Sequence, residues 1–236
     1  MQDIGTIITK ALIIPGTNIV ISFNPITIQM TLIVIGIILL FAWASTRKAS
    51  FFPRKFQVFT ETLLNWFDNV VKESLGEKSR WFLYLIMTIF VFVLISNWLA
   101  IIPHLTSPTR DLNTCLGLGL LVFFISHINA IRKKGLKKYL LNYFRPFWFL
   151  FPSNVISEFS KVLSHSFRLY GNIFAGGIVI AVIPIILVQL FKFFGIPLGI
   201  LAMPAINAFF VLFIGAVQAF VFSMLALAYI TVLQEE

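Results

Sequence analysis

The sequence predicts an all-α integral membrane protein with about five membrane helices and one amphipathic helix at the membrane interface. Of its 236 residues, 59% are apolar and 11% are charged, whereas a soluble domain has about 45–50% and about 25%. The apolar residues gather in stretches of the roughly 20 residues that cross a bilayer. The Lys and Arg residues gather between those stretches. This composition excludes an ordinary soluble enzyme, a disordered chain and a fibrous repeat, and we expect a single membrane domain over residues 1–236.

Three stretches predict single membrane spans. Residues 24–46 and 81–102 carry no charge, and residues 112–131 lie between Asp111 and Arg132 without a charge of their own. Each is long enough to cross a hydrocarbon core of about 30 Å as a helix. The start of the chain has no pattern of a secretory signal, so we expect the membrane helices themselves to direct insertion.

Residues 59–75, between the first two spans, have the pattern of an amphipathic helix. Phe59, Leu63, Trp66 and Val70 recur at helical spacing, and charged residues take the opposite side. We interpret this segment as a helix that lies in the membrane interface. A water-exposed helix packed on other loops is the alternative that the pattern leaves open.

The last two apolar stretches, residues 153–190 and 203–234, are longer than one perpendicular span. Thirty residues of helix extend to about 45 Å, beyond a core of about 30 Å. We therefore expect a long antiparallel hairpin that lies strongly tilted in the membrane. The expected bends are at Pro184, Pro197 and Pro204.

The positive charges predict the sidedness of the chain. Thirteen of the 18 Lys and Arg residues fall in two inter-span segments that alternating spans place on one side. Those segments hold Arg47, Lys48, Arg54, Lys55, Lys72, Lys78 and Arg80, and then Arg132, Lys133, Lys134, Lys137, Lys138 and Arg145. Cytoplasmic loops collect such residues, so the N-terminus is expected outside and the C-terminus in the cytoplasm. The net charge of +9 is thus a signal of topology, and we expect no nucleic-acid partner.

Arg168 lies inside hydrophobic sequence and needs a partner. An Arg at the bilayer centre costs roughly 2.5–3.5 kcal/mol on insertion scales, and its pKa above 12 keeps it charged. Glu158, the carboxylate on the same expected helix, is ten residues or about 15 Å away. We therefore expect a carboxylate from another chain to face Arg168. Water and carbonyl groups of its own helix bundle are the alternative.

Polar residues form a stripe around Arg168. At 100° per residue, six positions fall within about 80° of arc: Asn154, Glu158, Lys161, His165, Arg168 and Asn172. On the last stretch Asn207, Gln218 and Tyr229 recur every eleven residues, which nearly repeats one face. Two facing polar tracks favour a water-filled ion path. Polar contacts that only hold the helices together remain the alternative.

Three segments carry a family resemblance. The sequences SHSFRLYGNIFAGG (164–177), AVQAFVFSMLALAY (216–229) and NWLAIIPHLTSPTRDLNT (97–114) resemble subunit a of F-type ATP synthases. The likeness runs in order over about residues 25–236. It implies a non-catalytic stator subunit that contacts a ring of c subunits and the peripheral-stalk subunit b. We expect a bacterial inner membrane, with an organelle as the alternative, and no cofactor or metal.

The resemblance also implies roles for individual residues. Arg168 matches the essential arginine that faces the c-subunit carboxylate between two offset aqueous half-channels. Asn172 and Gln218 match polar residues near that arginine and the outer half-channel. Asp111 matches an acidic position after the outer loop, Glu158 one towards the cytoplasmic half-channel, and Lys161 a common lysine. Energy from ions passing through the two half-channels would drive rotation of the ring and ATP synthesis.

The chain departs from the family pattern at two positions of the outer path. Many relatives have an acidic residue where this chain has Gly177, and some have a histidine where it has Val211. We expect protons to be the coupling ion, with Na⁺ as the alternative. His165, three residues before Arg168, is expected either to assist proton access or simply to pack.

Some functional residues have a plain structural alternative. Asp111 could be only a helix N-cap or a partner of Arg110. His104 is expected to be a loop residue and His127 a packed interfacial one. A self-contained secondary transporter would need its own counter-ion for Arg168, and a purely structural subunit would tolerate its loss.

Overall fold

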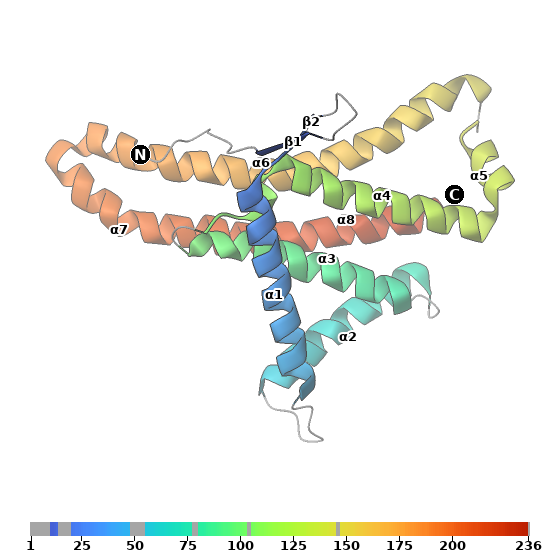
Figure 1. Ribbon diagram of the computed structural model, residues 1–236, viewed down its shortest axis with the longest axis horizontal. Helices are drawn as coiled ribbons and strands as arrows, with labels where there is room; N and C mark the ends of the chain where they lie inside the picture. The colour runs from blue at the N-terminus through green and yellow to red at the C-terminus, as the bar shows by residue number, and fades with distance from the viewer. Residues whose placement is uncertain are drawn as a thin grey trace.

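The computed structural model describes residues 10–13, 20–47, 55–76, 80–102, 105–144 and 147–235. Within them the chain is almost entirely helical (Figure 1). The exception is a short antiparallel hairpin of β1 (Lys10–Ile13) and β2 (Val20–Phe23), which the sequence analysis did not predict. The all-α class is confirmed. His104 and the cations Lys48, Arg54, Lys78 and Arg145 lie outside the described residues.

The first half of the chain forms the expected single spans and the amphipathic helix. The observed elements are α1 (Pro25–Arg47), α2 (Lys55–Leu75), α3 (Arg80–Trp98), the short 3₁₀ helices η1 (Leu99–Ile101) and η2 (Pro108–Arg110), and α4 (Leu112–Lys134). Asn24 starts α1, because its Oδ1 accepts a hydrogen bond from the backbone N–H of Ile26 at 3.0 Å and Pro25 suits the first helical position. These bounds differ from the predicted ones by a few residues.

The amphipathic helix α2 begins four residues before the predicted position. Phe67 and Val71 on its apolar side are buried, and the ring of Trp66 lies 5.6 Å from that of Phe220. The helix contacts α1, α3 and α8. Its apolar side therefore packs on membrane helices, and its other side carries the ion pair of Lys72 with Asp68.

The second half folds into a long antiparallel hairpin. After α5 (Leu136–Asn142) and η3 (Trp148–Leu150), the elements are α6 (Phe151–Phe191), η4 (Lys192–Phe194), α7 (Gly195–Ala208), η5 (Phe209–Ile214) and α8 (Gly215–Glu235). Figure 1 shows α7 and α8 returning alongside α6. The 41 residues of α6 extend to about 60 Å at 1.5 Å each, so this helix cannot stand upright within a core of about 30 Å.

The predicted start of the return helix is wrong, because this helix begins at Gly195 instead of residue 203. Pro184 and Pro204, two of the expected bends, lie inside α6 and α7. Pro197 lies in the first turn of α7, where its missing N–H would have no helical partner in any case. At the reversal Lys192 has φ 48°, and a Cβ on Gly195 would overlap the carbonyl group of Leu187. Only glycine fits this close approach.

A π-helix, η5, interrupts the return helix, although an uninterrupted helix was expected. Two side chains from the end of α3 bind carbonyl groups there: Trp98 Nε1 donates to Leu212 O at 3.1 Å, and Asn97 Nδ2 donates to Gly215 O at 2.9 Å. A π-turn widens the helix and frees carbonyl groups for such donors. The end of α3 therefore holds the start of α8.

The core lies where α3, α4, α6 and α8 meet. Gly119 allows α4 to approach Ser166 and Val162 of α6 closely. In contrast, α1 crosses the other helices steeply in Figure 1 and exposes Leu32, Leu39 and Leu40 by 62–66%. Among the described residues, three helices and the apolar stretch Trp148–Gln234 that contains the hairpin are long and apolar enough to cross a membrane. Such apolar surface belongs in lipid, and the chain is a multi-pass membrane protein.

Candidate functional site

Arg168 lies exposed on α6. Within the part of the chain that the structure describes, its guanidinium makes no ion pair and no hydrogen bond. Glu158, the carboxylate on the same helix, is bonded to Lys161 and Tyr229 instead. Arg168 is therefore a fixed positive charge presented at the surface of a membrane helix, where a counter-charge from outside this chain can reach it.

One helical turn after Arg168, α6 and α8 are joined by a polar contact. Asn172 Nδ2 donates a hydrogen bond to Gln218 Oε1 at 2.6 Å. Gln218 is only 4% exposed, and its Nε2 has no partner among the described residues. The structure thus brings together two of the residues that the sequence analysis assigned to the surroundings of the arginine.

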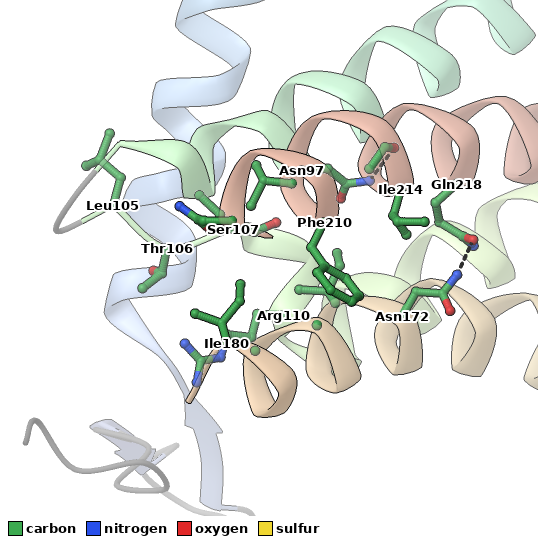
Figure 2. Close-up of a pocket in the computed structure, with 17 residues that line it drawn as sticks. Asn97, Leu105, Thr106, Ser107, Arg110, Asn172, Ile180, Phe210, Ile214 and Gln218 are labelled. Carbon is green, nitrogen blue, oxygen red and sulfur yellow. Dashed lines mark hydrogen bonds between the residues drawn. The ribbon is translucent and has the colours of Figure 1, made fainter. Parts of the chain in front are cut away.

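A cavity of about 180 Å³ extends from this contact towards the loop before α4. Figure 2 shows Asn172 and Gln218 at one end and Leu105 and Thr106 at the other. Its polar lining comes from Asn97, Thr106, Ser107, Arg110, Asn172, Asn207 and Gln218. A space of this size with several polar partners can hold a number of water molecules. This partly polar space extends from the loop to within one turn of Arg168, and the rest of its lining is apolar.

The cavity contains both positions where the chain departs from the family pattern. Gly177 and Val211 line it, and neither brings an ionisable group. Arg110 is the one charged residue among the lining residues that the structure describes, so the fixed charge of this space is positive. The sequence analysis missed Arg110 and Asn97 as lining residues. The family resemblance of residues 97–114, which include both, was the one signal that could have found them.

Asp111 lies at the start of α4. It is the N-cap of α4: its Oδ1 accepts a hydrogen bond from the backbone N–H of Asn113 at 3.0 Å. Its Oδ2 accepts one from the hydroxyl of Thr27 at 3.0 Å, which ties α1 to α4. Asp111 does not line the cavity, whereas its neighbour Arg110 does.

Towards the start of α6, Glu158 forms a second polar cluster. It is 8% exposed, and its carboxylate accepts hydrogen bonds from Lys161 Nζ at 2.7 Å and from the hydroxyl of Tyr229 at 2.5 Å. The Lys161 ammonium group also lies 5.4 Å from the centre of the Tyr229 ring. A buried carboxylate needs such partners to remain charged. This cluster joins α6 to the end of α8.

His165 lies between the Glu158 cluster and Arg168. Its Nδ1 is 2.8 Å from the carbonyl oxygen of Lys161, and its Nε2 is buried without a hydrogen bond from the described residues. It lines a space of about 10 Å³ together with Lys161 and Tyr229. That volume is at the lower limit for one water molecule.

The two polar tracks meet in pairs. Gln218 faces Asn172 and Tyr229 faces Glu158 across the α6–α8 contact. Asn207 lines the cavity. The π-helix η5 lies between Asn207 and Gln218, so the helix is irregular between these two members of the eleven-residue series. On one side of Arg168 the polar residues therefore line the cavity, and on the other side they form the hydrogen-bonded Glu158 cluster.

The comparisons with known proteins agree with this arrangement. The family described as ATP synthase A chain matches residues 28–231. A protein of Desulforamulus reducens named ATP synthase subunit a is 37% identical over 213 residues, which cover 89% of this chain and 79% of that protein. The proteins of that name in Moorella thermoacetica and Bacillus subtilis are 35% and 34% identical, cover 86% and 89% of this chain, and are themselves covered over 88% and 92%. Because the match spans nearly the whole chain, this protein belongs to the ATP synthase A chain family.

Proposed function

We propose that this chain is the ion-conducting stator subunit a of an F-type ATP synthase and that protons are its coupling ion. The observation that carries the proposal is the exposed, unpaired Arg168 between a polar cavity and a buried carboxylate cluster. Its partners are the carboxylates of a c-subunit ring that passes Arg168, and the peripheral-stalk subunit b. Nucleotide chemistry belongs to other subunits of the complex.

Arg168 acts on the ring by electrostatics. An ionised carboxylate of a c subunit is stabilised beside the guanidinium, whereas the protonated form gains no such attraction and can enter lipid. The permanent charge also separates the two aqueous routes and prevents ions from passing directly between them. Each elementary charge that crosses 100 mV releases about 2.3 kcal/mol, which is available for rotation.

The distribution of cations supports the orientation of the two routes. Lys133 Nζ donates to Gln234 Oε1 at 3.2 Å and Lys134 Nζ donates to Leu233 O at 2.7 Å, so the ends of α4 and α8 lie together. Cations concentrate at this end, which the positive-inside rule assigns to the cytoplasm of a bacterial cell. The N-terminus is then outside, the cavity is the outer half-channel, and the Glu158 cluster lies on the cytoplasmic route.

The proposal is tested with Arg168→Ala in the purified complex reconstituted into liposomes. ATP-driven proton uptake is expected to be lost while the c ring still co-purifies. Arg132→Ala, at an exposed position near the end of α4, is the matched control and is expected to pump normally. Normal pumping by Arg168→Ala would refute the stator role.

Sodium ions are the second candidate, because the cavity has no carboxylate or histidine among its described lining residues to identify a proton path. ATP-driven uptake of ²²Na⁺ in the presence of a protonophore distinguishes the two ions. Uptake that collapses with the proton gradient is expected. Uptake that persists would assign Na⁺ as the coupling ion.

A further inference from the structure

His127 packs among the rings of Phe123, Tyr139 and Tyr229, and both of its ring nitrogens have hydrogen-bond partners. It lies on α4, and its Nδ1 is 3.0 Å from the carbonyl oxygen of Phe123. A carbonyl oxygen only accepts, so the Nδ1 atom carries the hydrogen and donates it. In the neutral imidazole the other nitrogen, Nε2, then has a free lone pair and must accept.

Two tyrosine hydroxyls form a hydrogen-bonded series that ends at His127 Nε2. The Tyr143 hydroxyl lies 3.4 Å from His127 Nε2, and the Tyr139 hydroxyl lies 2.6 Å from that of Tyr143. Because Nε2 accepts, Tyr143 donates to it, and the Tyr143 oxygen is left to accept from Tyr139. The direction of all the hydrogen bonds in this series follows from the Phe123 carbonyl group, because that group can only accept.

The outer end of this chain is on the cation-rich side. Tyr139 lies on α5 beside the exposed Lys137 and Lys138. Burial raises the pKa of Tyr139 above its ordinary value, although its hydrogen bond with Tyr143 acts in the other direction. The phenol therefore keeps its proton near neutral pH and is available as a donor.

The inner end of the hydrogen-bonded series lies beside the Glu158 cluster. The His127 ring lies 6.0 Å from the ring of Tyr229, whose hydroxyl is bonded to Glu158. Asn154 on α6 donates to the carbonyl oxygen of Tyr143 at 2.8 Å and holds that turn against α6. The ionisable groups that face His127 from the packed elements are thus Tyr139, Tyr143, Glu158, Lys161 and Tyr229.

We propose that Tyr139, Tyr143 and His127 form a proton relay between the aqueous surface at α5 and the Glu158 carboxylate. The relay rests on the proposed function and supplies the cytoplasmic route with its entrance. Among the described residues, it also gives roles to three titratable side chains that the family resemblance left unassigned.

Each step of the relay conserves protons. His127 Nε2 gains a proton as the O–H bond of Tyr143 breaks, and Tyr143 is reprotonated from Tyr139. Tyr139 is only 8% exposed, so it takes its proton from a water molecule that reaches its hydroxyl beside α5. Rotation of the imidazolium ring turns Nε2 towards Glu158. The N–H bond then breaks, an O–H bond forms on the carboxylate, and the ring returns to its neutral form. Proton release to the cytoplasm follows the same steps in reverse.

The test uses the whole complex in liposomes with Tyr143→Phe and His127→Gln. Tyr143→Phe removes one oxygen and keeps the ring, and His127→Gln keeps a hydrogen-bonding side chain that cannot titrate. General acid–base groups contribute roughly 10²–10⁴-fold, and water can replace a missing link in part, so we expect ATP-driven proton uptake to fall about tenfold. Tyr84→Phe, at an exposed tyrosine of α3, is the matched control and is expected to pump at the wild-type rate.

The pH profile separates a relay from a structural role. The wild-type pumping rate is expected to contain a titration step that His127→Gln removes, whereas a loss of packing would lower the rate evenly at all pH values. Wild-type rates in both variants, or an even loss in both, would overturn the relay. If Arg168→Ala is inactive in the same assay while both variants pump normally, only the relay fails. If Arg168→Ala also pumps, the proposed function itself fails.

Discussion

Asn172 Nδ2 and Gln218 Oε1 lie 2.6 Å apart and join α6 to α8 one helical turn from Arg168 (Figure 2). The two partners differ in environment: Gln218 is 4% exposed, whereas Asn172 is exposed. The contact therefore sets the distance between α6, which carries Arg168, and α8, which carries Gln218. Its two ends should respond differently to substitution.

We expect Asn172→Ala to destabilise the complex more than Gln218→Ala. Asn172→Ala leaves the buried Gln218 amide without its partner, which costs about 1–3 kcal/mol. Gln218→Ala leaves the exposed Asn172 amide, which can bind water instead. The double variant should recover part of the loss, with a coupling of about 0.5–2 kcal/mol. Thermal unfolding of the purified complex measures all three. Strictly additive losses would show that the hydrogen bond contributes nothing.

Gly119 and Gly117 form a matched pair for the α4–α6 contact. A Cβ on Gly119 would overlap Ser166 Oγ and lie 3.3 Å from Val162 Cγ1, whereas a Cβ on Gly117 has nothing within 4 Å. Gly119→Ala is expected to separate the helices and cost about 1–3 kcal/mol. Gly117→Ala should be neutral or stabilising by up to about 1 kcal/mol, because alanine favours helix. Equal melting temperatures for the two variants would contradict this packing.

Asn97 is expected to be essential for the π-helix η5. Its amide donates to Gly215 O at 2.9 Å and accepts from the Thr109 hydroxyl at 2.8 Å. Asn97→Ala removes both hydrogen bonds from a buried site, although the Thr109 hydroxyl keeps its contact with Ser107 Oγ at 2.5 Å, and the expected cost is about 1–3 kcal/mol. It should also lower ATP-driven pumping, since η5 positions the start of α8. The control Asn113→Ala, at an exposed position, should change stability by less than about 0.5 kcal/mol.

Gly177 offers a direct test of the cavity. A Cβ there meets nothing within 4 Å, whereas a Cβ on the adjacent Gly176 would lie 3.2 Å from the Phe210 ring. Gly177→Glu should assemble normally and place a carboxylate in a space whose fixed charge is Arg110. Proton pumping is expected to persist, with a new acidic step in its pH profile. Gly176→Glu is expected to assemble less well because its Cβ presses on the Phe210 ring, and equal assembly of the two variants would contradict that contact.

Several elements were predictable because their signals are local. A hydrocarbon core of about 30 Å requires an apolar stretch of roughly 20 residues, so α1, α3 and α4 follow from hydropathy. The amphipathic period of α2 and the polar stripe of α6 follow from 3.6 residues per turn. The cost of a permanent charge in lipid singles out Arg168 before any contact is known.

Other elements have no local signal. The π-helix spans Phe209–Ile214, which are all apolar. Its hydrogen-bond donors, Asn97 and Trp98, come from α3. The strands β1 and β2 are four residues each and carry no periodic pattern long enough to predict them. The return helix begins before its predicted start and contains Pro197 and Pro204, because a helix in a membrane protein tolerates proline when neighbouring groups satisfy the freed carbonyl groups.

The amino-acid order alone thus determined the class, the spans, the amphipathic helix and the isolated cation, since each depends on the free energy of a segment in water or lipid. The tertiary structure decided which polar groups meet: Asn172 with Gln218, Tyr229 with Glu158, and Arg110 with the cavity. Those pairings depend on the register and close approach of helices far apart in the chain, and hydropathy carries no information about either.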